Sequence, residues 1–253
     1  MDTNLDARSE LLARPAVRHG SRLRLGMLLP AVNTEAEPQI EAMLPAGVTL
    51  HTTRLRMVES SSPRELLTMT ERVEEGAQLL AEAKVEHILF NCTAVTTFAP
   101  GLADSIRDRI TNATGIRASA TGDAVAAALA ALGAKKIVMV TPYLAEVNRN
   151  EVEFLGRHGI AVLKEHGEGL IYARDFRQIE PASWYRKVME MRDPAADAYF
   201  ISCAQARVIE IIAPLEQELG RPVVTSNQAA LWQSLRQSGI DDRIAGFGAL
   251  FQR

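Results

Sequence analysis

The chain has 253 residues, of which 47% are hydrophobic and 23% charged, a composition typical of a globular protein with a large core. Its net charge of −3 argues against nucleic acid or an anionic membrane as the main partner, and no apolar run reaches the ~18–20 residues that a membrane-spanning helix needs. Two cysteines are too few for a disulfide framework and indicate free thiols in the cytoplasm.

Residues 1–21 carry scattered charges and no apolar segment, so we expect a loose N-terminal arm rather than a secretion signal. Apolar runs of β type then alternate with helical stretches. The predicted strands are 23–29, 48–56, 86–90, 136–141, 160–164, 198–202 and 221–225. The predicted helices are 64–83, 99–112, 122–133, 144–158, 183–192, 206–219 and 228–238. Continuous apolar strands separated by helices indicate an α/β fold with parallel sheets covered on both faces.

The order of strands and helices is much the same in the two halves of the chain, which indicates two α/β lobes. We assign 22–120 plus 228–253 to the first lobe and 121–227 to the second, so that the last helix packs back on the first lobe. Ligands of open α/β sheets bind outside the carboxyl ends of the strands. Polar residues at five such ends therefore predict one cleft between the lobes: Asn33, Cys92, Tyr143, Cys203 and the pair Ser226–Asn227.

Each cysteine directly follows an apolar strand, Cys92 in FNCTAVTTF (90–98) and Cys203 in YFISCA (199–204). A single free cysteine at such a place is more often a small buried hydrophobe. Thr93 and Ala94, however, leave backbone N–H groups ahead of a predicted helix, whose dipole lowers the pKa of a thiol. As a pair facing one cleft, the cysteines suggest that one thiolate attacks or removes a proton while the other thiol supplies one.

Other candidate residues have ordinary structural explanations as well. Asn33 and Thr34 in PAVNTEAEP fit a helix cap, with Glu37 completing a capping box, and a capped helix start is also an anion site. Tyr143 is either a plain turn residue or a neutral donor to a carboxylate. The five histidines lack metal-ligand spacing, so we expect no metal. The sequence contains no phosphate-binding loop and no dinucleotide fingerprint, which argues against a nucleotide cofactor.

These motifs resemble the aspartate/glutamate racemase superfamily, in its branch of maleate isomerases and arylmalonate decarboxylases. The resemblance covers about 22–240. Its most specific pieces are GMLLPAVNTEAEP (26–38), NCTAVTTF (91–98), VTPYLAEVNRNEVEFL (140–155), ISCA (201–204) and PVVTSNQAALW (222–232). The resemblance implies two Rossmann-like lobes related by a pseudo-twofold axis, an active site between them, no cofactor, and a cysteine from each lobe at the substrate.

Within the branch, this chain is more similar to maleate isomerases, because arylmalonate decarboxylases have glycine where Cys92 stands and lack an Asn-Thr after the first strand. That similarity implies a small dicarboxylate substrate, to whose double bond Cys92 adds while Cys203 donates and recovers a proton. The residues expected to bind the substrate are Asn33, Thr34, Thr93, Ala94, Tyr143, Ala204 and Asn227.

One position departs from the maleate isomerase pattern. In ARDFRQIEP, Phe176 follows Asp175 where those enzymes typically carry an asparagine, which indicates a less polar or larger substrate. Three alternatives therefore stay open: a two-thiol racemase, an arylmalonate-type decarboxylase that uses Cys203 alone, and a non-catalytic protein that binds small acids. We also expect a homo-oligomer, with helices 64–83 and 228–238 as candidate dimer faces.

Overall fold

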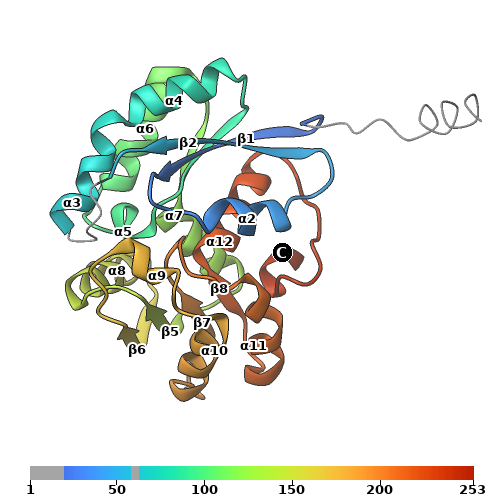
Figure 1. Cartoon of the computed structure of the whole chain (residues 1–253). Coiled ribbons are helices and arrows are strands. Elements are labelled where there is room, and N and C mark those ends of the chain that lie inside the picture. Colours follow the sequence, from blue (N-terminus) through green and yellow to red (C-terminus); the bar gives the residue numbers. More distant parts are fainter. Residues whose placement is uncertain (1–19, 58–62) are drawn as a thin grey trace, which may run out of the picture.

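Two four-stranded parallel sheets form the framework of the protein (Figure 1). The computed structural model describes residues 20–57 and 63–253. The strands are β1 (Leu23–Pro30), β2 (Val48–Leu55), β3 (His87–Phe90), β4 (Ala118–Ala120), β5 (Lys136–Thr141), β6 (Ala161–Gly167), β7 (Ala198–Ile201) and β8 (Val223–Thr225). The sheets have the orders β2-β1-β3-β4 and β6-β5-β7-β8, and every strand pair is parallel. Because the two orders correspond strand for strand, the predicted α/β fold of two repeated lobes is confirmed.

Helices connect the strands and cover both sheets. The α-helices are α2 (Ala36–Ala42), α3 (Pro63–Thr68), α4 (Val73–Glu82), α5 (Thr93–Thr96), α6 (Leu102–Thr114), α7 (Thr121–Ala131), α8 (Ala145–Arg157), α9 (Ala173–Phe176), α10 (Pro181–Glu190), α11 (Ile212–Leu219) and α12 (Ser226–Gln237). Short 3₁₀ turns occupy Met69–Arg72, Ile209–Ile211 and Ala249–Gln252. No helix in the described part of the chain is long and apolar enough to cross a membrane.

The predicted helix 64–83 is interrupted at the 3₁₀ turn. The hydroxyls of Thr68 and Thr70 donate to the carbonyls of Glu65 and Leu67, three residues back, at 2.6 and 2.8 Å. Such bonds compete with the regular helix ladder, and they account for the tighter turn between α3 and α4.

The hydrophobic core has two parts because strand side chains alternate between the faces of the sheet. In β1, Met27 and Leu29 pack into the layer that contains α7 and α12, whereas Leu28 packs on the opposite face with residues of α4. The shared layer also includes Met139 and Phe200 of the second sheet. Helices α7 and α12 therefore lie between the two sheets and join them (Figure 1).

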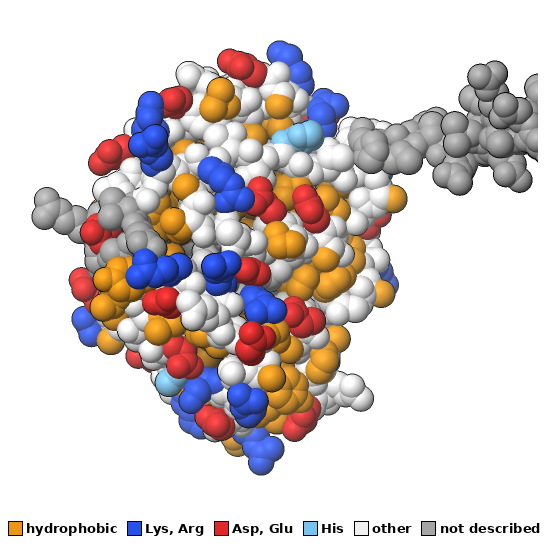
Figure 2. Space-filling view, viewed as in Figure 1, with side chains coloured by type: hydrophobic (Ala, Val, Ile, Leu, Met, Phe, Trp, Pro, Cys, Tyr) orange, Lys and Arg blue, Asp and Glu red, His pale blue; other side chains and the backbone are white. Residues whose placement is uncertain are grey.

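Three other expectations have different outcomes. The lobe boundaries at 120/121 and 227/228 stay a prediction, because α7 and α12 contact strands of both sheets. The expected dimer face on 228–238 is wrong, since α12 is buried inside this chain. The expected dimer face on 64–83 stays a prediction; it includes Leu79 of α4, which is 53% exposed. Of the predicted arm 1–21, residues 1–19 lie outside the described residues. On the face drawn in Figure 2, basic and acidic side chains are interspersed with hydrophobic ones.

Candidate active site

A cavity of about 40 Å³ lies where the carboxyl ends of strands from both sheets meet. Seven of the predicted site residues line it: Asn33, Cys92, Thr93, Ala94, Tyr143, Cys203 and Ala204. The other lining residues are Pro30, Val32, Met57, Leu66, Asn91, Ala173, Phe176 and Gln205. Thr34 and Asn227 are not among the lining residues, so the structure brings together most of the predicted set but not these two.

Cys92 is the residue at which β3 gives way to α5. Its backbone is extended, with φ −150° and ψ 105°, and its carbonyl accepts the Thr96 N–H at 3.1 Å and the Thr96 hydroxyl at 2.9 Å. The backbone N–H groups of Val95 and Ala94 act on its thiol and lower its pKa. The sequence predicts the next helix from 99, but α5 begins immediately after Cys92 and brings these amides to the thiol.

Cys203 occupies the equivalent place after β7, in a strained backbone conformation. Its φ of 107° is a value that residues with a Cβ rarely adopt. The Cys203 N–H donates to the Ser226 hydroxyl at 3.0 Å, and the Gln205 N–H donates to the Cys203 sulfur at 3.3 Å. The Gln205 side chain in turn donates to the Ala173 carbonyl at 2.7 Å. These contacts hold the thiol at the cavity in spite of the backbone strain.

A single hydroxyl, that of Ser226, connects the two cysteine segments. It accepts from the Thr93 hydroxyl at 2.8 Å and from the Cys203 N–H at 3.0 Å. Ser226 is the first residue of α12, which Thr225 caps through a capping box with Gln228. The start of α12 therefore fixes both thiol-bearing turns at once.

Asn227 supports the site from behind the cavity. Its side-chain oxygen accepts from the Asn91 amide at 3.1 Å, and its amide donates to the Ala204 carbonyl at 3.0 Å. The Thr121 hydroxyl donates to the Asn91 oxygen at 2.9 Å. Asn227 is thus placed to hold the residues next to both cysteines, rather than in the cavity wall where the sequence places it.

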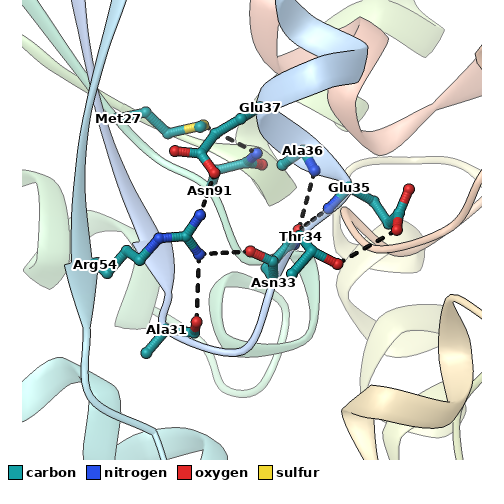
Figure 3. A network of polar contacts seen from close by, with 9 residues as sticks. All are labelled: Met27, Ala31, Asn33, Thr34, Glu35, Ala36, Glu37, Arg54 and Asn91. Carbon is teal, nitrogen blue, oxygen red and sulfur yellow. Dashed lines mark hydrogen bonds and ion pairs between the residues drawn. The ribbon is translucent and has the colours of Figure 1, made fainter.

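Asn33 is held in the cavity wall by Arg54, an arginine that no motif of the sequence marks (Figure 3). Its side-chain oxygen accepts from the backbone N–H groups of Glu35 and Ala36 at 2.9 and 3.0 Å, so its amide nitrogen is the group left for a ligand. The Arg54 guanidinium donates to the carbonyls of Ala31 and Asn33 at 3.2 and 2.6 Å. Arg54 projects from β2, and only the fold shows that it reaches this loop.

The capping box expected from Thr34 and Glu37 does not form. Thr34 is exposed, and its hydroxyl donates to Glu35 at 3.3 Å, while Glu37 pairs with Arg54. Asn33 takes over the start of α2, because its side-chain oxygen accepts from the N–H groups of both Glu35 and Ala36.

The expectation of a lowered thiol pKa is wrong for both cysteines. Burial raises the pKa of the Cys92 thiol to about 12 and that of the Cys203 thiol to about 11. Hydrogen bonds from Val95 and Ala94 to Cys92, and from the Tyr143 hydroxyl to Cys203, lower these pKa values only in part. The described residues that line the cavity include no Lys, Arg or His that would stabilise a thiolate. Both thiols are therefore neutral at pH 7.

Tyr143 is a hydrogen-bond donor in this site. Burial raises the pKa of its phenol well above the ordinary value, and the nearby Cys203 adds to the shift, so the hydroxyl keeps its proton. The Tyr143 ring meets the Phe176 ring edge-on, with centroids 5.8 Å apart. Phe176 is one of the apolar side chains that line the cavity, together with Val32, Met57 and Leu66.

The site has the features of an acid-binding cavity with two thiols. Both neutral N–H and O–H groups and apolar side chains line it, and this suits a small carboxylic acid with an apolar portion. No group of three or more His, Cys, Asp or Glu residues in the described segments is placed to hold a metal ion.

Comparisons with known proteins agree with this site. The model of the arylmalonate decarboxylase family matches residues 25–251. A maleate isomerase of Pseudomonas putida is 28% identical in an alignment 250 residues long, which covers 90% of this chain and 96% of that protein. The crystal structure of a maleate isomerase from Pseudomonas putida superposes with a TM-score of 0.87 at 23% identity, covering 90% of this chain and 98% of the other.

A second solved structure carries a chemical intermediate. It is a maleate cis–trans isomerase of Nocardia farcinica, a cysteine-to-serine mutant with a covalently bound succinylcysteine. It superposes with a TM-score of 0.84 at 22% identity, covering 90% of this chain and 98% of the other. At this identity, the likeness shows that the two chains share a fold.

Proposed function

Because the chain belongs to the arylmalonate decarboxylase family, we propose that it is a cofactor-independent cis–trans isomerase of the maleate isomerase type, acting on a small dicarboxylate. The observation that carries the proposal is that two thiols, on the equivalent strand ends of β3 and β7, line one small cavity together with neutral donors. Relatives named maleate isomerase and the succinylcysteine of the Nocardia enzyme support the same chemistry.

The reaction begins when the Cys92 thiol loses its proton to solvent and becomes the thiolate. Its sulfur adds to one carbon of the cis double bond, so that a C–S bond forms and the π electron pair moves onto the adjacent carboxylate as an enolate. The Cys203 thiol protonates the carbon of this enolate and gives a succinyl thioether. After rotation about the new single bond, the Cys203 thiolate takes the proton back, and the returning electron pair expels Cys92 and leaves the trans isomer.

Neutral donors bind the two carboxylates in this proposal. The Asn33 amide nitrogen and the Tyr143 hydroxyl are side-chain donors of the cavity wall, and the backbone N–H groups of Thr93, Ala94 and Ala204 are further candidates. Such donors stabilise the charge that develops on the enolate oxygens without forming a fixed ion pair with the substrate. Thr34 and Asn227 take no direct part.

The apolar residues that line the cavity indicate the kind of dicarboxylate. Phe176 is 4% exposed and packs against Tyr143, so it offers a carboxylate no hydrogen bond. A substrate that carries an alkyl substituent beside one carboxylate would contact Phe176 and Met57. We therefore expect a substituted maleate to be used better than maleate itself.

The proposed function is tested by incubating the protein with maleate and with methylmaleate and following the ultraviolet absorbance. We expect isomerisation by the wild type and its loss, by at least a thousandfold, in Cys92→Ala. Cys203→Ala should accumulate a thioether on Cys92, which intact-protein mass spectrometry detects as an added substrate mass. Wild-type activity in either variant would contradict the roles given to the two thiols.

Decarboxylation is the second candidate function, because the matched family model is that of arylmalonate decarboxylases and apolar side chains line part of the cavity. In that reaction Cys203 alone protonates the carbanion left by loss of CO₂. Release of CO₂ from phenylmalonate that persists in Cys92→Ala and disappears in Cys203→Ala would favour decarboxylation.

A further inference from the structure

A buried carboxyl group, that of Glu151, lies behind the thiol site and has no role in the proposed reaction. Glu151 projects from α8 and is 1% exposed. Its Oε1 accepts the Ser202 hydroxyl at 2.7 Å, and Ser202 directly precedes Cys203. Its Oε2 has no hydrogen-bond partner within the part of the chain that the structure describes, where Glu151 also forms no ion pair.

The charge state of Glu151 affects the pKa values of three groups in the site. A negative charge on Glu151 raises the pKa of Cys92 after β3, of Tyr143 after β5 and of Cys203 after β7. On the neighbouring strand β6, Glu165 is exposed and bonds to Asn148. The other charged residues of α8 are exposed: Glu146, Arg149, Glu153 and Arg157. Glu151 is thus the charged side chain that faces the thiols from this helix.

Burial with one unsatisfied oxygen keeps this carboxyl protonated at neutral pH. Burial raises the pKa of Glu151 to about 8, and the Ser202 hydrogen bond opposes the shift only in part. The described cavity lining holds no cation that would balance the two negative charges of a dicarboxylate. A further negative charge on Glu151 would therefore repel the substrate, as well as the enolate that forms from it.

We propose that Glu151 is a specificity-determining residue that works as a proton switch: the cavity accepts a dicarboxylate only while Glu151 carries its proton. The inference rests on the proposed function and adds the charge state that the site requires. It places the residue beside the reacting groups, where it sets the field at the substrate without touching it.

The test compares Glu151→Gln with Glu153→Gln, a matched control on the exposed side of the same helix. Succinate, a saturated dicarboxylate that the thiols cannot attack, is titrated calorimetrically between pH 6.5 and pH 9.5. For the wild type and Glu153→Gln we expect binding to weaken about tenfold per pH unit above roughly pH 8, because one proton is taken up with the ligand. For Glu151→Gln we expect a change of less than twofold over the same range. The same slope in all three proteins would overturn the proposal.

A second variant changes the switch without removing it. Ser202→Ala deletes the hydrogen bond that favours the ionised carboxyl, so the onset of weaker binding should move to higher pH. An onset that stays at the wild-type pH would contradict the assignment to Glu151. This variant keeps the proposal testable if Glu151→Gln does not fold, which circular dichroism would show.

Thiol alkylation separates this proposal from the proposed function. If succinate binds to none of the proteins at any pH, the substrate class is wrong, and the switch is then judged from the thiols alone. At pH 9.5, iodoacetamide should label Cys203 at least threefold faster in Glu151→Gln than in the wild type and Glu153→Gln, because the repelling charge is gone. Equal labelling rates would show that Glu151 exerts no control over the site.

Discussion

The raised thiol pKa values make a quantitative prediction about cysteine reactivity. At pH 7.5, a thiol with a pKa of about 12 is ionised about 1,000-fold less than one with the ordinary value of 9.0. A less acidic thiolate is the stronger nucleophile, by roughly 20-fold for this difference. We therefore expect iodoacetamide to label Cys92 of the folded protein about 50-fold more slowly than Cys92 of the same chain unfolded in urea.

The assay is alkylation for timed intervals, followed by digestion and mass spectrometry of the two cysteine peptides. Between pH 7 and pH 10 the rate at Cys92 should rise about tenfold per pH unit, since the thiolate is the reacting form. Folded and unfolded rates within threefold of each other at pH 7.5 would refute the argument that burial controls the thiol. Ionising Cys92 at pH 7.5 costs about 6 kcal/mol, so the rate of isomerisation should also rise with pH up to about pH 8, where Glu151 begins to lose its proton.

Two further changes test the cavity and the core. Phe176→Asn supplies the missing amide, so maleate turnover should rise by about tenfold relative to methylmaleate turnover. Competition between the two substrates measures this ratio, and an unchanged ratio would show that Phe176 does not select the substrate. Burial lowers the pKa of His87 to about 4, against 6.5 when unfolded, so its contribution to stability is complete above pH 6.5 and is lost as the pH falls toward 4. Between pH 7.5 and pH 5 the wild type should lose about 2 kcal/mol more unfolding free energy than His87→Asn in urea titrations, and parallel losses would contradict this linkage.

The architecture could be predicted from the sequence because the central strands of both parallel sheets are continuous runs of apolar residues. The sequence predicts seven of the eight described strands, including the edge strands β2 and β6, which are only partly buried. It does not predict β4, since its three residues, ASA, contain no large apolar side chain. The start of α12 at Ser226, two residues before the predicted start, also depends on a cap that composition alone does not reveal.

The site was predictable only in its chemistry-bearing residues. Cys92 and Cys203 stand out because each follows an apolar strand, and the two halves of the chain repeat that setting. Arg54, Glu151 and Ser226 act through contacts with residues distant in the sequence, and no local pattern marks such contacts. The direction of the thiol pKa shift was missed for a related reason, because burial is set by the packing of both lobes.

The Ser226 hydroxyl, bonded to the segments of both cysteines, has a consequence for how the enzyme admits its substrate. If the two lobes moved apart to admit substrate, the hydrogen bonds of Ser226 to Thr93 and Cys203 would have to break. The distance between the two sulfurs would then change in every turnover. With the link intact, the separation of the two thiols stays fixed. We then expect new substrate specificities to evolve by substitution of cavity-lining residues such as Phe176, while the two cysteines and Ser226 stay unchanged.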